Sequence, residues 1–202
     1  MAGFRALLRN PPAGLYCPPG DFYIDPVRPV ARAVITHGHA DHARSGHGAV
    51  LATPQTLAIM TARYGADFAA AAEPAPYGQA VSRDGVTVTL APAGHVLGSA
   101  QAVLEWKGVT AVVSGDYKRR PDPTCRPFEP VRCQLFVTEA TFGLPVFRFP
   151  DASDEVARLM KSVALFPERT HLVGAYALGK AQRIIALLRA AGYERTIYAH
   201  GA

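Results

Sequence analysis

Four of the chain's seven histidines fall within eleven residues, in the stretch THGHADHARSGHG from 36 to 48. His37 and His39 are two residues apart, so in an extended segment both imidazoles face the same way and can grip one ion. Asp41 and His42 are adjacent, so they point in different directions and can serve a second ion. Imidazole and carboxylate ligands together favour zinc, with manganese or iron as alternatives. The stretch therefore predicts the first half of a two-metal site.

Two further candidate ligands follow strand-like segments later in the chain. His95 comes directly after VTVTLAP, and Asp116 ends the apolar run AVVSGD. Because functional groups gather in loops at the carboxyl ends of strands, we expect both side chains to join the histidine loop. A carboxylate can bridge two cations, and Asp116 is the natural candidate for that role. His47 lies beyond the motif, and we expect it to be structural or to support a ligand.

Before about residue 142 the sequence predicts mainly β-strands, and these must position the candidate ligands. We expect strands at 21–25, 31–35, 49–54, 86–92, 100–106, 110–116 and 134–141. Thr53 caps and Pro54 opens a helix that runs through Arg63, and Gly65 ends it. Lys107 and Gly108 form the turn between two of the strands.

Beyond residue 142 helix and strand signals alternate. We expect helices around 154–165 and 178–191 and strands at 171–176 and 195–199. Strand–helix–strand units predict a parallel sheet. We place a domain boundary near 145–150, which gives domains 1–147 and 148–202. The last strand should feed another element, so we expect the chain to be C-terminally truncated.

Composition excludes several classes of protein. Apolar residues make up 49% and charged residues 18% of the chain, which suits a packed core and not a disordered chain. Arg5 and Arg9 interrupt the N-terminal apolar run, and no segment approaches the roughly 18 apolar residues of a membrane span. We therefore expect a cytoplasmic protein without a membrane partner. Cys17, Cys125 and Cys133 read as three free thiols of a reducing compartment.

The basic residues offer sites for an anionic partner. The net charge is +5 and the pI about 9.3, which favours such a partner only weakly. Lys118, Arg119 and Arg120 lie within four residues of Asp116, where they could contact phosphate. Lys180 opens a helix, whose free N–H groups favour anions. A solvated loop and an ordinary turn are the alternatives. Contacts to the phosphate backbone carry no sequence information, so we expect little sequence preference.

The motifs resemble a known superfamily. HGHADH, with His95 in GHVLGS and Asp116 in SGDY, resembles the metallo-β-lactamase superfamily. TEATFG and GAYALGKAQRI resemble its β-CASP branch, which acts on nucleic acid. GLYCPPGDFYIDPVRPVARAVITHGHADHARSGH is similar to the bacterial ligase-associated DNA exonucleases. The resemblance covers essentially the whole chain. It implies an α/β (α+β) fold, an incomplete metallo-β-lactamase αββα sandwich followed by the start of a β-CASP α/β domain.

The resemblance also implies roles for particular residues. It implies three ligands for a first zinc, two for a second and one that bridges both: His37, His39 and His95, then Asp41 and His42, then Asp116. Glu139 would orient a histidine that donates a proton to the leaving oxygen, so the implied catalytic set is Asp41, Asp116 and Glu139. Two further histidines of the family have no counterpart here, so we expect an under-ligated second metal. A DNA ligase or helicase is the partner that the resemblance implies.

The leading hypothesis is a zinc-dependent nuclease that hydrolyses DNA phosphodiester bonds, as an exonuclease in DNA repair. Zinc lowers the pKa of a bound water to about 7, so we hypothesise that a hydroxide held by two zinc ions attacks phosphorus in line. The preference for DNA over RNA rests on the resemblance alone. Three alternatives stay open: an RNA-processing β-CASP nuclease, a small-molecule metallo-hydrolase such as a thioesterase or lactonase, and an inactive nucleic-acid-binding fragment.

Overall fold

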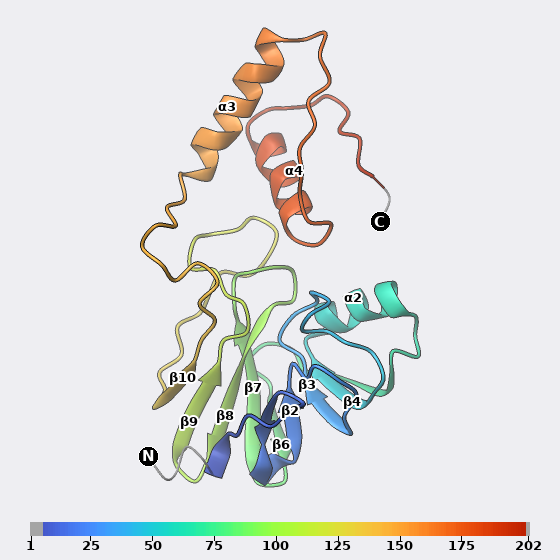
Figure 1. Ribbon diagram of the computed structural model, residues 1–202, viewed down its shortest axis with the longest axis vertical. Coiled ribbons are helices and arrows are strands. Elements are labelled where there is room, and N and C mark those ends of the chain that lie inside the picture. The colour runs from blue at the N-terminus through green and yellow to red at the C-terminus, as the bar shows by residue number, and fades with distance from the viewer. Residues whose placement is uncertain (1–5, 201–202) are drawn as a thin grey trace. The chain divides into compact units, whose positions relative to one another are not determined.

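The computed structural model describes residues 6–200 (Figure 1). Arg5 and the chain end at Ala202, on which two of the expectations above rest, lie outside this range. The chain divides between Glu139 and Ala140 into two compact units, which are described separately below. The assignment of domains 1–147 and 148–202 stays a prediction.

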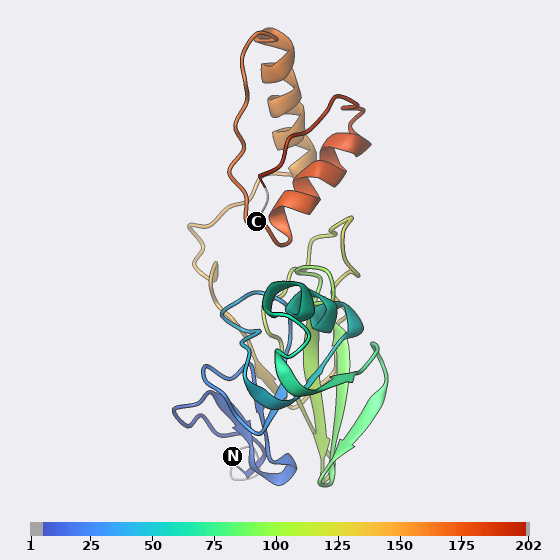
Figure 2. The same ribbon diagram turned by 90° about the vertical axis from the view of Figure 1, so that its right-hand side faces the viewer.

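The first unit contains two five-stranded sheets (Figure 1, Figure 2). The first sheet has the order β1 (Leu15–Cys17), β2 (Phe22–Ile24), β3 (Arg32–Val34), β4 (His47–Ala52) and β5 (Ala69–Pro74). Its strands are parallel except for the antiparallel pair β1–β2, whose connection contains a 3-10 turn at Pro18–Gly20. The second sheet has the order β10 (Leu135–Val137), β9 (Val109–Val113), β8 (Ala100–Trp106), β7 (Val86–Pro92) and β6 (Ala80–Arg83). It is antiparallel except for the parallel pair β10–β9.

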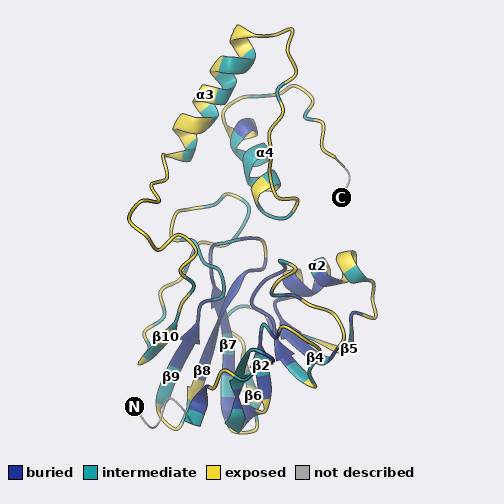
Figure 3. Ribbon diagram, viewed as in Figure 1, coloured by how far each residue is buried: buried dark blue, intermediate teal, exposed yellow. Residues whose placement is uncertain are grey.

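The two sheets share one hydrophobic core. Phe22 and Ile24 of the first sheet belong to the same buried cluster as Leu90 and Leu104 of the second. Alternate residues of β7 are buried, as expected for a strand with one face on a core. The helix α2 (Pro54–Tyr64) packs on the other face of the first sheet through a second buried cluster that includes Leu57. Figure 3 shows the buried residues concentrated in these strands. This helix–sheet–sheet arrangement confirms the predicted α/β fold class.

Local sequence signals explain most of these elements. Each of the seven strands predicted in this unit overlaps an observed strand. Thr53 caps α2 by accepting a hydrogen bond from the backbone N–H of Thr56, and Gly65 ends the helix. Lys107 and Gly108 both have positive φ values, 47° and 77°, as a tight hairpin turn requires. β1, β5 and β6 were not predicted; β5 is rich in alanine, which is depleted in strands.

His47 opens β4 and is buried, and the backbone N–H of Val30 donates to its Nδ1. Cys17, Cys125 and Cys133 are free thiols. Among the described residues, no helix has the length and apolar character needed to cross a bilayer.

The second unit contains two helices, α3 (Ala152–Leu165) and α4 (Lys180–Ala190), as the sequence predicts. The two strands predicted at 171–176 and 195–199 are wrong, because neither segment forms a strand in the described part of this unit. A strand needs a neighbour that takes up its backbone hydrogen bonds. Here Leu172 and Tyr198 are 93% and 91% exposed. The apolar residues that read as strands are therefore extended chain with exposed side chains.

We predict that Leu104→Ala lowers the free energy of unfolding of the first unit by about 2–5 kcal/mol, because it leaves a cavity between the two sheets. The measurement is urea unfolding followed by the fluorescence of Trp106, the chain's single tryptophan, which packs against this core. Leu97→Ala is the matched control, because Leu97 belongs to the same unit but is 49% exposed. It should cost less than about 1 kcal/mol. Equal losses in both variants would contradict the shared core.

Candidate metal centre

The candidate ligands come from three loops, each at the carboxyl end of a strand. His37 and His39 follow β3, His95 follows β7, and Asp116 follows β9. Each loop thus leaves the core where the strand ends. The structure brings one ligand atom from each of these four residues within 4.8 Å of the others. Two sheets therefore contribute to one cluster, as the sequence predicts from strand ends alone.

The spacing of the donor atoms suits a single cation. His39 Nδ1 lies 3.0 Å from His37 Nε2 and 3.1 Å from His95 Nε2. Asp116 Oδ2 lies 3.9 Å from His37 Nε2 and 3.6 Å from His95 Nε2. Donors in a tetrahedron around zinc, at about 2.0–2.1 Å from the ion, lie about 3.4 Å from one another. The observed separations, 3.0–3.9 Å, lie on either side of that value, so the four donors are placed closely enough to hold one zinc ion.

Two histidines of this cluster, His37 and His95, are held in the form that binds metal. Burial lowers the pKa of His37, and the neighbouring His42 and His95 lower it further. Burial likewise lowers the pKa of His95. Both imidazoles are therefore neutral at pH 7. Neutral imidazole carries the lone pair that coordinates a metal.

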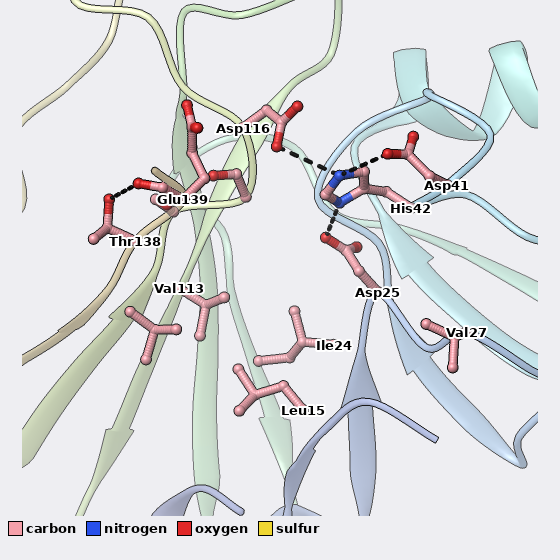
Figure 4. Close-up of a pocket in the computed structure, with 13 residues that line it drawn as sticks. Leu15, Ile24, Asp25, Val27, Asp41, His42, Val113, Asp116, Thr138 and Glu139 are labelled. Carbon is pink, nitrogen blue, oxygen red and sulfur yellow. Dashed lines mark hydrogen bonds and ion pairs between the residues drawn. The ribbon is translucent and has the colours of Figure 1, made fainter. Parts of the chain in front are cut away.

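A second group of donors shares Asp116 with the first (Figure 4). His42 Nε2 lies 3.4 Å from Asp116 Oδ1 and 3.7 Å from Asp41 Oδ2. The two oxygens of Asp116 thus face different groups, which is the arrangement of a bridging carboxylate. The side chain of Asp41 is 75% exposed, so this second group is open to solvent. The assignment of Asp41 and His42 to a second ion stays a prediction.

Asp25 also lies at the site, although the sequence analysis did not predict it as a site residue. It follows β2, and its carboxylate lies 2.7 Å from His42 Nδ1 (Figure 4). It also accepts hydrogen bonds from Thr36, at 2.8 Å from the backbone N–H and at 2.6 Å from the hydroxyl. By accepting a hydrogen bond from Nδ1–H of His42, Asp25 orients that ring with Nε2 toward the candidate metal position.

The same carboxylate acts on His37 through Thr36. A threonine hydroxyl has one proton, and that of Thr36 is donated to Asp25. His37 Nδ1, 3.1 Å from the same hydroxyl oxygen, therefore donates its own proton to it. This fixes His37 in the tautomer whose Nε2 faces the cluster. The available signal for Asp25 was its place as the last residue of the predicted strand at 21–25, since a position at the end of a strand is the reasoning that identified His95 and Asp116.

His42 and Asp116 form a charged pair in the metal-free protein. Burial opposes the charged imidazole, but hydrogen bonds to Asp116 and Asp25 outweigh it and raise the pKa of His42 to about 10. The hydrogen bond to His42 lowers the pKa of Asp116 to about 2. At neutral pH His42 is therefore protonated, and a metal ion must displace that proton to bind Nε2.

Glu139 lies at a pocket beside this pair, and its predicted catalytic role stays a prediction. The pocket has a volume of about 340 Å³, and its polar side includes Asp41, His42, Asp116 and Glu139. Its apolar side is formed by Leu15, Ile24, Val27, Val113 and Val137 (Figure 4). Both sheets therefore line it, and it opens beside the candidate second metal position.

The predicted phosphate contacts differ in their surroundings. Lys118 Nζ lies 2.8 Å from the carboxylate of Asp122, which partly neutralises its charge. Arg119 and Arg120 are exposed in the same loop. Lys180 opens α4 in the second unit, and its ammonium lies 5.0 Å from the ring centroid of Tyr176. Nucleic-acid contact by these residues stays a prediction.

Comparison with known proteins places the chain in a family. No family model matches it. It is 32% identical over 184 residues to a protein named probable DNA ligase from Opitutus terrae, a match that covers 87% of this chain and 17% of that protein. It is 35% identical over 116 residues to cleavage and polyadenylation specificity factor subunit 3 of Dictyostelium discoideum, covering 55% of this chain and 15% of that protein. It is 33% identical over 108 residues to endoribonuclease ysh1 of Aspergillus fumigatus, covering 51% and 12%.

The chain thus spans less than a fifth of the length of these relatives. Its two-sheet fold, with a cluster of histidines and aspartates that could hold a metal ion, is that of a sandwich of the metallo-β-lactamase type. Within that superfamily, the chain belongs to the β-CASP branch.

We predict that Asp25→Asn weakens zinc binding about 10- to 100-fold, because the carboxylate that orients His42 and Thr36 is lost. The measurement is competition with a chromophoric chelator at pH 7. Asp84→Asn is the control, since Asp84 is a surface residue whose carboxylate pairs with Arg32. It should bind zinc as the unsubstituted chain does. Unchanged affinity in Asp25→Asn would contradict the orienting role.

We also predict that zinc binding at pH 7 releases a proton from His42. The reason is the raised pKa of its imidazole in the metal-free protein, about 10. In that protein the charged pair contributes stability that is complete between about pH 4 and pH 6.5. It is lost as the pH rises through about 10, where His42 deprotonates, and as the pH falls through about 2, where Asp116 protonates. Calorimetric titration in PIPES and in Tris should give heats that differ by the number of protons released multiplied by the difference between the buffers' ionisation enthalpies. His42→Ala should reduce that difference, and identical heats in both buffers would contradict the prediction.

Proposed function

We propose that the chain is part of a metal-dependent nuclease that hydrolyses phosphodiester bonds in nucleic acid. The observation that carries the proposal is the pair of donor groups that share Asp116, each facing one of its oxygens. Two cations about 3.5–4 Å apart are the arrangement used for in-line displacement at phosphorus. Zinc suits the nitrogen-rich donor set, and manganese or iron are the alternatives.

The residues of the chain would each do a defined part of this chemistry. When bound, two zinc ions would supply hydroxide at neutral pH and charge stabilisation for the phosphoryl oxygens. His37, His39 and His95 would hold the first ion and Asp116 would hold both. Asp25 keeps the Nδ1 proton of His42 away from the metal side of its ring.

The other residues would handle substrate and leaving group. Glu139, at the pocket beside Asp116, would position the group that protonates the leaving oxygen. Arg119 and Arg120 would bind backbone phosphates and so give affinity with little sequence preference.

DNA is the substrate that we favour, in an exonuclease of DNA repair. The relative named probable DNA ligase matches 87% of this chain, whereas those named for polyadenylation or as endoribonucleases match about half of it. That name also supports a DNA ligase as partner and, with it, a cytoplasmic site of action. RNA is the second candidate, supported by the names of the other relatives.

We predict that the zinc-loaded protein cleaves end-labelled DNA and that Asp116→Asn lowers the rate by on the order of a thousandfold. Loss of the shared carboxylate would remove several kcal/mol of transition-state stabilisation. The assay compares DNA and RNA strands of one sequence, with and without EDTA. Asp84→Asn should keep full activity.

Cleavage of RNA alone would favour the second candidate. Turnover of a thioester without cleavage of bis-nitrophenyl phosphate or of either nucleic acid would contradict the nuclease proposal and favour a small-molecule hydrolase.

A further inference from the structure

Helix α2 contacts two of the loops that carry candidate metal ligands. The helix connects β4 to β5 and packs on the first sheet. Thr56, Ile59 and Arg63 lie three and four residues apart, so they form one stripe along the helix. That stripe contacts the loop of His95 at one end and the loop of His37 and His39 at the other, as the following distances show.

At the start of α2, two hydroxyl groups hold the His95 loop. Thr53 Oγ1 donates to the carbonyl oxygen of Gly98 at 2.7 Å, and Thr56 Oγ1 donates to the same oxygen at 3.0 Å. Both hydroxyls are buried. A Cβ atom on Gly98 would lie 2.8 Å from the backbone nitrogen of Thr56, and φ of Gly98 is +79°. The backbone of this loop therefore rests directly on the helix.

The His95 loop passes that restraint on to the imidazole. Ser99 Oγ accepts hydrogen bonds from the backbone N–H groups of His95, at 3.0 Å, and of Val96, at 3.2 Å. The backbone N–H of Ser99 donates to the carbonyl of Val96 at 2.9 Å. Gly98 lies inside this closed turn. A shift of Gly98 relative to α2 would therefore move His95 as well.

Near its end, α2 holds the other ligand loop. The guanidinium of Arg63 donates to the carbonyl oxygen of Gly38 at 2.5 Å. A Cβ atom on Gly38 would lie 2.8 Å from Cγ2 of Ile59. Gly38 separates His37 from His39 in the sequence, so both ligands of this loop are placed by the same contact.

We propose that α2 is a brace that fixes the distance between the His39 and His95 imidazoles and thereby sets the affinity of the first metal site. Thr56 and Arg63 are its positioning residues. An α-helix is a rigid spacer of about 1.5 Å per residue, so the two loops, which come from different sheets, are held at a set separation. The inference rests on the proposed metal-dependent function, because it concerns the same site.

Removing the polar contacts is the first test. Thr56→Val and Arg63→Met should each weaken zinc binding about 3- to 10-fold, and the double variant by less than the product, because either substitution already releases one end of the same brace. The visible spectrum of the cobalt-substituted protein should change in the same variants, since it reports ligand geometry. Thr61→Val is the matched control, because its hydroxyl donates within the helix, to the carbonyl of Leu57. It should leave the zinc affinity unchanged.

Crowding the other contact is the second test. Gly38→Ala should weaken zinc binding at least about 10-fold by pushing the histidine loop off the helix. Adding Ile59→Ala to the same chain removes the methyl group that the new Cβ atom would strike, so the double variant should regain most of the affinity. The melting temperature measured in EDTA separates metal affinity from folding.

The outcomes distinguish failure of the proposed brace from failure of the proposed metal-dependent function. Wild-type zinc affinity in Thr56→Val and Arg63→Met, or an effect confined to the melting temperature, would overturn the brace alone. Failure of Ile59→Ala to rescue Gly38→Ala would also overturn it. An unsubstituted chain that binds no zinc would overturn the metal-dependent function together with the brace.

Discussion

Everything in the first unit is arranged around nitrogen atoms that converge on one point. His39 Nδ1 lies within 3.1 Å of a ring nitrogen from His37 and from His95. Without a cation, such a cluster gathers lone pairs out of water, which costs free energy. Cooperative folding must hold the three rings in place against that cost, and a divalent ion at their centre would offset it. The surrounding structure therefore has to hold these three imidazole rings in place.

The fold supplies this support from both sheets. Sheet strands end where the ligand loops begin, so the shared core of the sandwich fixes the starting point of each loop. The backbone N–H of Ala100 in the second sheet donates to the carbonyl of Thr36 at 2.8 Å, which ties the two sheets together beside His37. Thr36 also connects Asp25 to His37. The residues that hold the sheets together thus also set the orientation of the imidazoles.

Local patterns in the sequence predicted what depends on local physics. The spacing of His37 and His39, the strand ends before His95 and Asp116, and the cap at Thr53 all act within a few residues. Asp25 also stands at a strand end, but its contact with His42 could not be found from local patterns, because it depends on pairing between β2 and β3, where Ile24 lies opposite Val34. That register brings Asp25 next to the ring of His42, seventeen positions later in the sequence.

In the second unit the sequence predicted elements that do not form. Segments 171–176 and 195–199 have the apolar character of strands, yet strand formation depends on a paired neighbour that propensity does not supply. The helices α3 and α4, whose hydrogen bonds are internal, were predicted to within two residues at either end.

The most direct test of the metal centre is the zinc content of the purified chain, measured by elemental analysis beside His39→Ala. His39 contributes the nitrogen that lies closest to both other imidazoles. Our account predicts at least one zinc ion per chain and its loss in the variant. No zinc in the unsubstituted chain, or the same content in both proteins, would contradict it.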